Sequence, residues 1–502
     1  MVGRFRGRRR RVRRRVRAGG VRMSVDAPRR AAYDVLRAVA ESDSYANLVL
    51  PPLLAERRIS GRDAAFATEL AYGTLRLRGY YDAVLALCAT RPLSEIDPRV
   101  LDALRLGAHQ LLGMRVPPHA GVASTVDLVR DVAGPGAAKF ANAVLRQVGR
   151  ADPAEWDRRL AERATDRLEL LAARTSHPAW IVRALRESLA ADGAAGELGE
   201  LLTADNAAPR VTLAARPGLV SERELEREHH VSPFPGVPTA WHLDGGDPGR
   251  IPAVRQGRLG VQDAGSQLVT LAFAGAPVTG RDRVWADLCA GPGGKSALLG
   301  ALLAERTGWA DGEADGRFDD EAETDARPAL VAGEVQPHRV GLVQRSVKAV
   351  PRGLIDVRQW DGRDLGRDEP GRFDRVLVDA PCTGLGALRR RPEARWRRTP
   401  ADLDSLTGLQ TALLTSAIDA TRPGGVVGYV TCSPHLAETR GIVEPVLAGR
   451  DDVEPIDAVE VARAVAPGLA GIAETDGRGP FLQLWPHRHG TDAMFLALLR
   501  RR

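Results

Sequence analysis

The stretch RVWADLCAGPGGK, residues 283–295, decides the fold of this chain. It begins as a short apolar run that ends at Asp287 and continues into a turn rich in glycine. A buried strand followed by such a turn brings backbone N–H groups and closely approachable glycines to the carboxyl edge of a sheet, where α/β folds bind ligands. The stretch therefore predicts a strand and the ligand-binding turn of an α/β sheet.

Strand-like and helix-like segments alternate from Val261 to the carboxyl end, which is typical of a doubly wound, Rossmann-like α/β domain. We assign this domain to residues 256–502. The predicted strands are residues 283–288, 329–335, 353–357, 375–379 and 425–430, with a closing pair near 481–484 and 494–498. Residues 311–325 hold eight acids and one arginine, so we expect a surface insertion within residues 304–328.

The glycine-rich turn matches neither common phosphate-binding pattern. A P-loop requires glycine where Cys289 stands, and the order of residues 291–294 is not that of a dinucleotide fingerprint. A ligand without phosphate remains, and a cationic adenosine compound of that kind is S-adenosylmethionine. The predicted cofactor-binding segment is Cys289, Ala290, Gly291, Pro292, Gly293, Gly294 and Lys295.

Acids stand at the ends of the next three predicted strands. Glu334 follows the second strand, where an acid can accept hydrogen bonds from both ribose hydroxyls. Asp361 follows the third strand, either as a partner for an adenine amino group or as the cap of a turn. Asp379 ends the fourth strand. We expect all three to contact the cofactor.

Two of the four cysteines follow strand-like runs: Cys382 in the sequence DAPC and Cys432 in the sequence TCS. Carbon 5 of cytosine becomes nucleophilic only after a thiolate has added to carbon 6. A second cysteine can then assist elimination, and a carboxyl group near ring nitrogen 3 stabilises the adduct. The pattern predicts a pyrimidine methyltransferase with Cys382, Cys432 and Asp379 as catalytic residues. Because the cysteines lack a Cys-x-x-Cys spacing, we expect no metal site.

The amino-terminal part is predicted to be helical. Apolar residues recur at helical spacing in residues 32–39 and 100–112, so residues 28–150 form a compact helical domain. Residues 151–255 contain further helical stretches and then short strand-like runs broken by proline and glycine. We expect linking helices and a small α+β subdomain there.

The net charge of +7 comes from the first residues of the chain. Residues 1–22 hold eleven arginines and no acid, so the remainder sums to 7 − 11 = −4. This segment is either a disordered basic arm that meets nucleic acid or a wrongly extended start, since Met23 is an alternative first residue. The composition indicates neither a membrane span nor a secretion signal, and we expect a cytoplasmic protein.

A run of arginines follows Cys382 closely. Residues 389–398 contain six arginines around a tryptophan. Arginines bind phosphates and a tryptophan can stack on an unpaired base, as recognition of single-stranded RNA requires. The predicted RNA-binding residues are Arg389, Arg390, Arg391, Arg395, Trp396 and Arg397.

Four motifs together resemble those of the RNA cytosine-5 methyltransferases: residues 261–267, 287–295, 379–382 and 431–433. Residues 104–112 and 140–146 resemble the RNA-binding domain of the antitermination factor NusB. With that domain included, the chain from about residue 28 resembles the bacterial 16S ribosomal RNA cytosine-5 methyltransferase B family. Small departures are Gly291 for alanine, Glu334 for aspartate and Thr383 for serine. Residues 213–216 also lack the family's usual Arg-Val-Asn.

The resemblance implies roles for the residues already selected. Cys432 corresponds to the nucleophile and Cys382 to the cysteine that aids product release. The segment 289–295, Glu334, Asp361 and Asp379 correspond to the S-adenosylmethionine site. The implied substrate is 16S ribosomal RNA, and we expect a monomer. Transfer RNA as the substrate, or a non-catalytic RNA-binding antitermination factor, are the alternatives.

Overall fold

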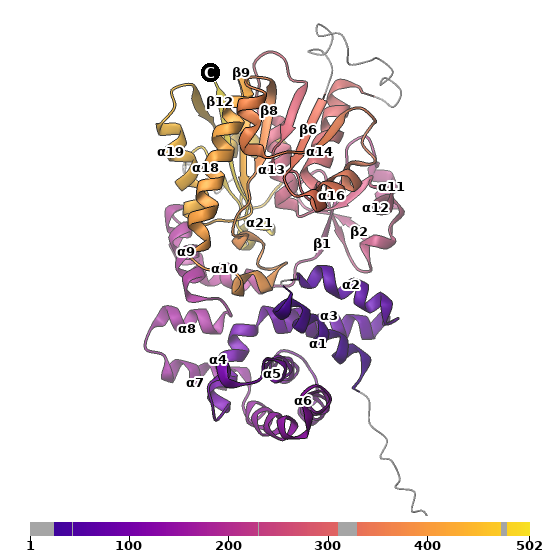
Figure 1. The fold of residues 1–502 in the computed structure, drawn as a ribbon, viewed down its shortest axis with the longest axis vertical. Helices are drawn as coiled ribbons and strands as arrows, with labels where there is room; N and C mark the ends of the chain where they lie inside the picture. Colours follow the sequence, from indigo (N-terminus) through magenta and orange to yellow (C-terminus); the bar gives the residue numbers. More distant parts are fainter. Residues whose placement is uncertain (1–24, 43, 229, 310–328, 473–478) are drawn as a thin grey trace, which may run out of the picture.

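The computed structural model describes residues 25–42, 44–228, 230–309, 329–472 and 479–502. The predicted basic arm at residues 1–22 lies outside the described residues. Residues 310–328, which make up most of the predicted acidic insertion, also lie outside them. The amino-terminal part of the molecule is built from helices, and the other part contains a large sheet with helices around it (Figure 1). The predicted order, a helical domain followed by an α/β domain, is therefore confirmed.

The amino-terminal helices pack around one apolar cluster that includes the predicted stripe Ala32, Val35, Leu36 and Val39. Two helices begin with an aspartate side chain that accepts a backbone N–H, which satisfies donors that a helix start leaves unpaired. The helices are α1 (Ala27–Glu41), α2 (Ala46–Glu56), α3 (Gly61–Arg76), α4 (Arg78–Cys88), α5 (Pro98–Leu112) and α6 (Pro118–Val148).

The middle of the chain contains helices and then a small antiparallel sheet, as expected. The helices are α7 (Pro153–Arg163), α8 (Arg167–Arg174), α9 (Ala179–Ala191) and α10 (Leu198–Asp205). The sheet has the order β2-β3-β1-β4. Its strands are β1 (Val211–Ala215), β2 (Val231–Pro233), β3 (Ala240–Leu243) and β4 (Leu259–Val261), accompanied by α11 (Glu222–Glu226) and α12 (Pro252–Gln256).

The large sheet has the order β10-β12-β9-β8-β5-β6-β7, and β11 pairs with β12. The strands are β5 (Val284–Asp287), β6 (Ala329–Glu334), β7 (Ile355–Gln359), β8 (Phe373–Asp379), β9 (Thr421–Thr431), β10 (Val453–Ile456), β11 (Leu482–Gln483) and β12 (Phe495–Arg501). Strands β5 to β9 pair in parallel, whereas β12 is antiparallel to its neighbours. The chain leaves β5 towards β6 and later returns to β8 on its other side, so the order reverses between β5 and β8.

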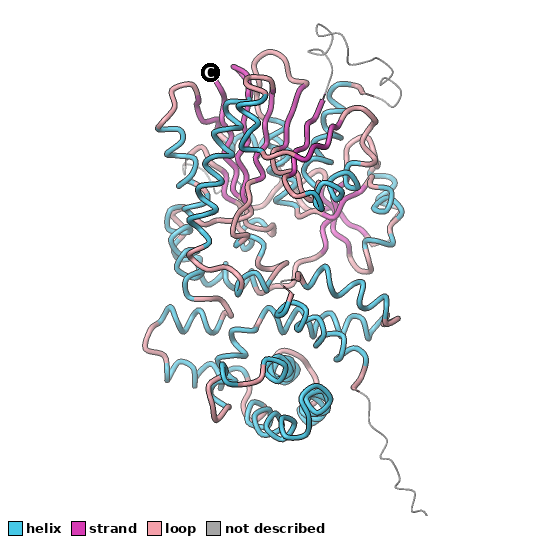
Figure 2. Tube along the Cα trace, in the orientation of Figure 1, coloured by secondary structure: helices cyan, strands magenta, loops and turns pink. Residues whose placement is uncertain are grey.

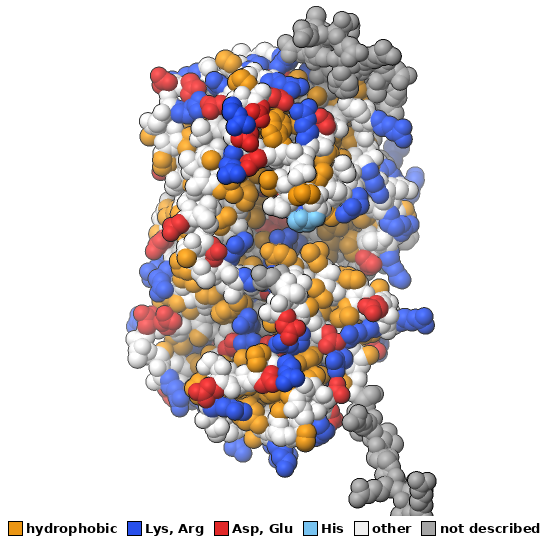
Figure 3. Space-filling model, viewed as in Figure 1, with side chains coloured by type: hydrophobic (Ala, Val, Ile, Leu, Met, Phe, Trp, Pro, Cys, Tyr) orange, Lys and Arg blue, Asp and Glu red, His pale blue; other side chains and the backbone are white. Residues whose placement is uncertain are grey.

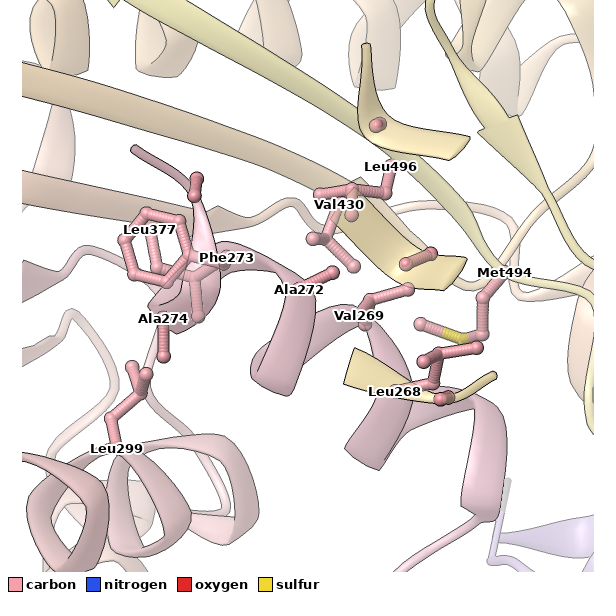
Figure 4. Packing of buried hydrophobic residues seen from close by; sticks show 14 of the residues in the cluster. Leu268, Val269, Ala272, Phe273, Ala274, Leu299, Leu377, Val430, Met494 and Leu496 are labelled. Carbon is pink, nitrogen blue, oxygen red and sulfur yellow. The ribbon is translucent and has the colours of Figure 1, made fainter. Parts of the chain in front are cut away.

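Helices cover both faces of this sheet (Figure 2). On one face, Phe273 and Leu268 pack against Leu377, Val430 and other sheet residues (Figure 4). The helices on this face of the sheet are α13 (Ala264–Gly275), which carries Phe273 and Leu268, α14 (Gly294–Thr307) and α20 (Ala458–Val465). Helix α16 (Pro337–Val347) lies nearby. The helices of the opposite face are α17 (Leu365–Asp368), α18 (Asp402–Ala420) and α19 (Arg440–Ala448).

The predicted strands of the large sheet are present, with shifted ends. Strand β9 begins at Thr421 rather than at residue 425, and β8 begins at Phe373 rather than at residue 375. Strand β10 was not predicted, because Val453–Ile456 is short and contains Pro455. The predicted start of the acidic insertion is wrong, because helix α14 continues to Thr307.

Candidate functional site

The predicted site residues gather at the carboxyl edge of the parallel strands. Asp287, Glu334 and Asp379 each end a strand, and Cys432 directly follows β9. The strand order reverses between β5 and β8, which is where open α/β sheets bind ligands. The parallel registers therefore bring residues that are far apart in the sequence to one edge of the sheet.

The glycine-rich turn joins β5 to α14. The Ala290 N–H donates to the carbonyl of Gly333 on the neighbouring strand at 2.9 Å. Gly293 has a φ of +105°, and a Cβ there would lie 2.6 Å from Ser346 Cβ. Glycine is required at this position because both the backbone angle and the space exclude a side chain.

Glu334 is held firmly beside Gly291. It is 3% exposed and its Oε1 accepts the backbone N–H of Gln336 at 2.9 Å. Its Oε2 lies 3.4 Å from Nη1 of Arg339, and Arg339 also donates to the carbonyl of Gly291. A Cβ on Gly291 would lie 2.1 Å from Glu334 Oε2, so the absence of a side chain makes room for the carboxylate.

Asp361 and Asp379 differ in their surroundings. Asp361 caps a short 3-10 helix (Gly362–Asp364) by accepting the N–H of Arg363 at 3.0 Å, and it pairs with the Arg363 guanidinium at 2.6 Å. The hydrogen bond from the Arg363 guanidinium is the main cause of the lowered pKa of Asp361. Asp379 accepts a hydrogen bond from Lys295 Nζ at 2.8 Å. Burial opposes the charge of Lys295, but Asp379 outweighs it and the pKa of Lys295 is raised.

Asp287 also lies at this site, although it is not among the predicted site residues. Its Oδ2 accepts from the Ser296 hydroxyl at 2.6 Å, whereas its Oδ1 is buried without a hydrogen-bond partner. Burial raises the pKa of Asp287 to about 7. Its place at the end of the strand that leads into the glycine turn was the signal that could have identified it.

The two selected cysteines lie in contact. Their sulfur atoms are 3.4 Å apart, and both residues are partly buried. A hydrogen bond from Cys382 lowers the pKa of Cys432, and the positive charges of Lys295 and Arg391 act in the same direction. The pKa of Cys382 is raised well above its ordinary value by the Cys432 sulfur and by burial. The pKa values of the two thiols are thus shifted in opposite directions.

The arginine run contains side chains with two different environments. Arg389 and Arg390 form ion pairs with Asp263 and Asp492; Arg389 is buried and Arg390 is half-buried. Arg391 is exposed and its guanidinium lies 4.9 Å from the ring centre of Tyr45, at the start of α2. Among the six residues predicted to bind RNA, only Arg391 is exposed.

The other three members of that predicted set pack against the amino-terminal helices and the middle of the chain. Arg395 is 0% exposed and donates to the carbonyls of Arg76, Ser176 and Asp205 and to the side chain of Asn206. Trp396 packs against Gly79 and the Arg78 guanidinium. Arg397 donates to the carbonyls of Val39 and Ser44. In this structure the predicted RNA contact is wrong for Arg395, because its side chain is fully buried inside the protein.

Charged side chains of both signs are interspersed over the face shown in Figure 3. Among the described residues, no group of three or more His, Cys, Asp or Glu side chains is placed to hold a metal ion. None of the helices within the described ranges is long and apolar enough to cross a membrane.

Comparisons with known proteins agree with this arrangement. The family described as 16S rRNA methyltransferase RsmB/F matches residues 322–500, and the NusB family matches residues 26–150. A Mycobacterium tuberculosis protein, whose name states methyltransferase activity without a substrate, is 49% identical over 96% of this chain and 98% of its own length. Ribosomal RNA small subunit methyltransferase B of Salmonella paratyphi B is 28% identical over 89% of this chain and 96% of its own length.

The crystal structure of PH0851 shares the fold, with a TM-score of 0.74 and 20% identity over 94% of this chain and 98% of that one. The sheet, the amino-terminal helices and these relatives lead to one assignment. The chain belongs to the RsmB/F family of 16S rRNA methyltransferases and carries a NusB-family domain at its amino-terminal end.

Proposed function

We propose that the protein uses S-adenosylmethionine to methylate carbon 5 of a cytosine in 16S ribosomal RNA, through a covalent bond between Cys432 and carbon 6. The observation that carries this proposal is the contact of 3.4 Å between the sulfur atoms of Cys382 and Cys432. Their pKa values are shifted in opposite directions, which suits one cysteine for attack and the other for a later proton transfer.

The residues at the sheet edge fit the cofactor. Glu334 would accept the ribose hydroxyls and Asp361 the adenine amino group, while the turn of residues 289–295 leaves the backbone open to close approach. The unpartnered Oδ1 of Asp287 is a further buried acceptor beside this turn. When bound there, S-adenosylmethionine supplies an electrophilic methyl group.

The first covalent step belongs to Cys432. Its thiolate adds to carbon 6, so an S–C bond forms and the ring electrons move towards carbon 5 and nitrogen 3. Lys295 donates a hydrogen bond to Asp379. The positive charge of Lys295 offsets the negative charge that enters the ring. Asp379 is assigned to the stabilisation of nitrogen 3 through Lys295, whose ammonium group it holds as the hydrogen-bond donor for that nitrogen. Carbon 5 then carries the electron pair that takes the methyl group.

The second step belongs to Cys382. After addition, Cys432 is a thioether without charge, so the main cause of the raised pKa of Cys382 is removed. Cys382 can then lose its proton to solvent and accept the proton from carbon 5. As that C–H bond breaks, the ring double bond re-forms, the S–C bond to Cys432 breaks, and Cys432 leaves as a thiolate.

Arg391 is assigned to the RNA backbone beside the target nucleotide. It is exposed, its charge acts on Cys432, and it lies over the ring of Tyr45 from the amino-terminal domain. Arg397 lies 4.9 Å from the same ring centre. A guanidinium held in this way is well suited to bind a phosphate.

Trapping of the adduct tests the cysteine assignment. Cys382→Ala should accumulate a covalent protein–RNA complex that survives denaturing gel electrophoresis, whereas Cys432→Ala should form none. An adduct in Cys432→Ala alone would exchange the two roles, and no adduct in either variant would refute the covalent mechanism.

The substrate needs a separate test. Unmodified 16S ribosomal RNA and transfer RNA are incubated with the protein and S-adenosylmethionine, and 5-methylcytosine is mapped by bisulfite sequencing. We expect a single ribosomal position to be methylated. Methylation confined to transfer RNA would reject the ribosomal substrate, and methylation of neither RNA would favour a non-catalytic RNA-binding role.

A further inference from the structure

A buried carboxylate behind the cysteines has no part in the mechanism described above. Glu438, in the 3-10 helix Leu436–Glu438 after Cys432, is 0% exposed. Its Oε1 accepts the backbone N–H of Thr383 at 2.8 Å, and its Oε2 accepts the Thr383 hydroxyl. Thr383 is the residue that follows Cys382, so this carboxylate anchors the loop that carries the second cysteine.

Two further contacts extend the anchor to both sides of Cys382. Gln410 of α18 donates from Nε2 to Glu438 Oε1 at 3.2 Å and to the carbonyl of Pro381 at 2.8 Å. The Thr383 hydroxyl lies 3.1 Å from the hydroxyl of Ser433, which follows Cys432. The residues before and after Cys382 are therefore tied to one carboxylate, and the same network reaches the Cys432 loop.

The position of Glu438 is itself fixed. Tyr429 of β9 donates its hydroxyl to the Glu438 carbonyl at 2.9 Å. The donors that reach the carboxylate are a backbone amide, a hydroxyl and a side-chain amide, all of them neutral. A buried carboxylate with neutral partners is costly to fold around, which indicates that it is retained for something other than stability.

We infer that Glu438 is a positioning residue for product release: it holds Cys382 where its sulfur can take the proton from carbon 5. This inference rests on the proposed cysteine mechanism. Attack by Cys432 depends on Cys382 only through the hydrogen bond that favours the Cys432 thiolate, an effect that a higher pH offsets. Proton removal, in contrast, requires Cys382 within hydrogen-bond reach of carbon 5 at any pH. Loss of the anchor should therefore slow release more than attack.

Variants of Glu438 separate these two steps. Glu438→Gln keeps the size and one acceptor, and Glu438→Ala removes both acceptors. We expect both to accumulate the covalent RNA adduct, with release slowed by about tenfold to a hundredfold, as for a misplaced catalytic group. Alanine should have the larger effect, and adduct formation should stay close to the wild-type rate when it is measured at a pH high enough to ionise Cys432. A purely structural defect would lower the adduct instead of raising it.

Two further variants keep the test decisive. Thr383→Val removes the hydroxyl contacts but keeps the backbone bond to Glu438, and it should raise the adduct to a smaller extent. Glu454→Gln removes a carboxylate on the terminal strand β10 that pairs with Arg500 and Arg502. This variant is the control and should leave the adduct level unchanged.

The outcomes distinguish this inference from the proposed function. If Cys382→Ala traps an adduct but neither the Glu438 variants nor Thr383→Val do, the inference is wrong and the mechanism stands. If Cys382→Ala traps none, the mechanism itself fails. If a Glu438 variant does not fold, Thr383→Val alone decides, and an unchanged adduct level overturns the positioning role.

Discussion

Cys382 and Cys432 are the same residue type at the same sheet edge, and their neighbours make them different. Cys432 has a thiol donor and the nearby positive charges of Lys295 and Arg391, so its pKa is lowered. The hydrogen bond between Cys382 and the Cys432 sulfur, together with burial, raises the pKa of Cys382. The opposite shifts of the two pKa values thus follow mainly from the hydrogen bond between the two sulfur atoms.

Substitution of Cys382 should change the pH dependence of Cys432. Cys382→Ala removes the hydrogen bond that is the main cause of the lowered pKa, so the Cys432 thiolate forms at higher pH. We expect the midpoint of Cys432 alkylation by iodoacetamide, followed by peptide mass spectrometry, to shift upwards relative to the wild type. Cys88 is an internal control, because burial raises its pKa to about 11. A midpoint that moves down would contradict the assigned hydrogen bond.

The second residue pair to test is Gly291 and Glu334. Gly291→Ala would push the Glu334 carboxylate from its place, because the new Cβ would lie 2.1 Å from Oε2. We expect cofactor affinity, measured by calorimetry, to fall by roughly tenfold to a hundredfold, as for the loss of a charged hydrogen bond. The double variant Gly291→Ala/Glu334→Asp should recover most of the affinity, because the shorter acid leaves room for the methyl group.

Gly136→Ala is a matched control, since nothing lies within 4 Å of a Cβ at that position. It should leave affinity unchanged. Strictly additive losses in the double variant would show that the two positions are not coupled.

At the scale of elements, the segment that follows Cys382 connects the catalytic edge to the helices of the other half. Arg391→Ala should weaken RNA binding and reduce the slope of log affinity against log salt by about one, as for the loss of one phosphate contact. Arg502→Ala, at the exposed carboxyl end, is the control and should change neither quantity. An unchanged salt slope for Arg391→Ala would exclude a phosphate contact.

The sheet and its glycine turn were predictable because their signals are local. The run from Val284 to Lys295 contains both the apolar strand and the turn, and the cysteines follow their strands directly. The arginine run misled for the opposite reason. Its charge density is local, but the partners of Arg395 are Arg76, Ser176 and Asp205, which lie more than a hundred residues away. Glu438 was not predicted for the same reason, since its partner Thr383 lies in the loop after a different strand, β8.

On the scale of the whole molecule, buried ionisable groups lie where the two halves meet. Asp205 is the last residue of α10, and its carbonyl accepts a hydrogen bond from Arg395. Burial raises the pKa of the Asp205 carboxyl group to about 7. The folded protein therefore holds this proton more tightly than the unfolded chain. Its contribution to stability is present below the unfolded pKa and is lost as the pH rises through about 7.

Replacement of Asp205 should reverse this pH effect. We expect Asp205→Asn to raise the melting temperature relative to the wild type at pH 8, and to do so less at pH 5, because asparagine cannot ionise. Scanning calorimetry at both values measures the difference. Asp404→Asn, at an exposed position, should show no such pH dependence. A larger gain at pH 5 than at pH 8 would contradict the raised pKa.

Arg395 also bears on how this protein can be divided. Its guanidinium belongs to the catalytic half, yet carbonyls of α3, of the segment before α9 and of α10 receive its hydrogen bonds. A shortened protein that starts at the catalytic domain would leave these donors without acceptors, thirteen positions after Cys382. The halves are therefore not interchangeable modules. Chimeras that exchange the RNA-binding part between relatives should retain activity only when the backbone of these three segments keeps its place against Arg395.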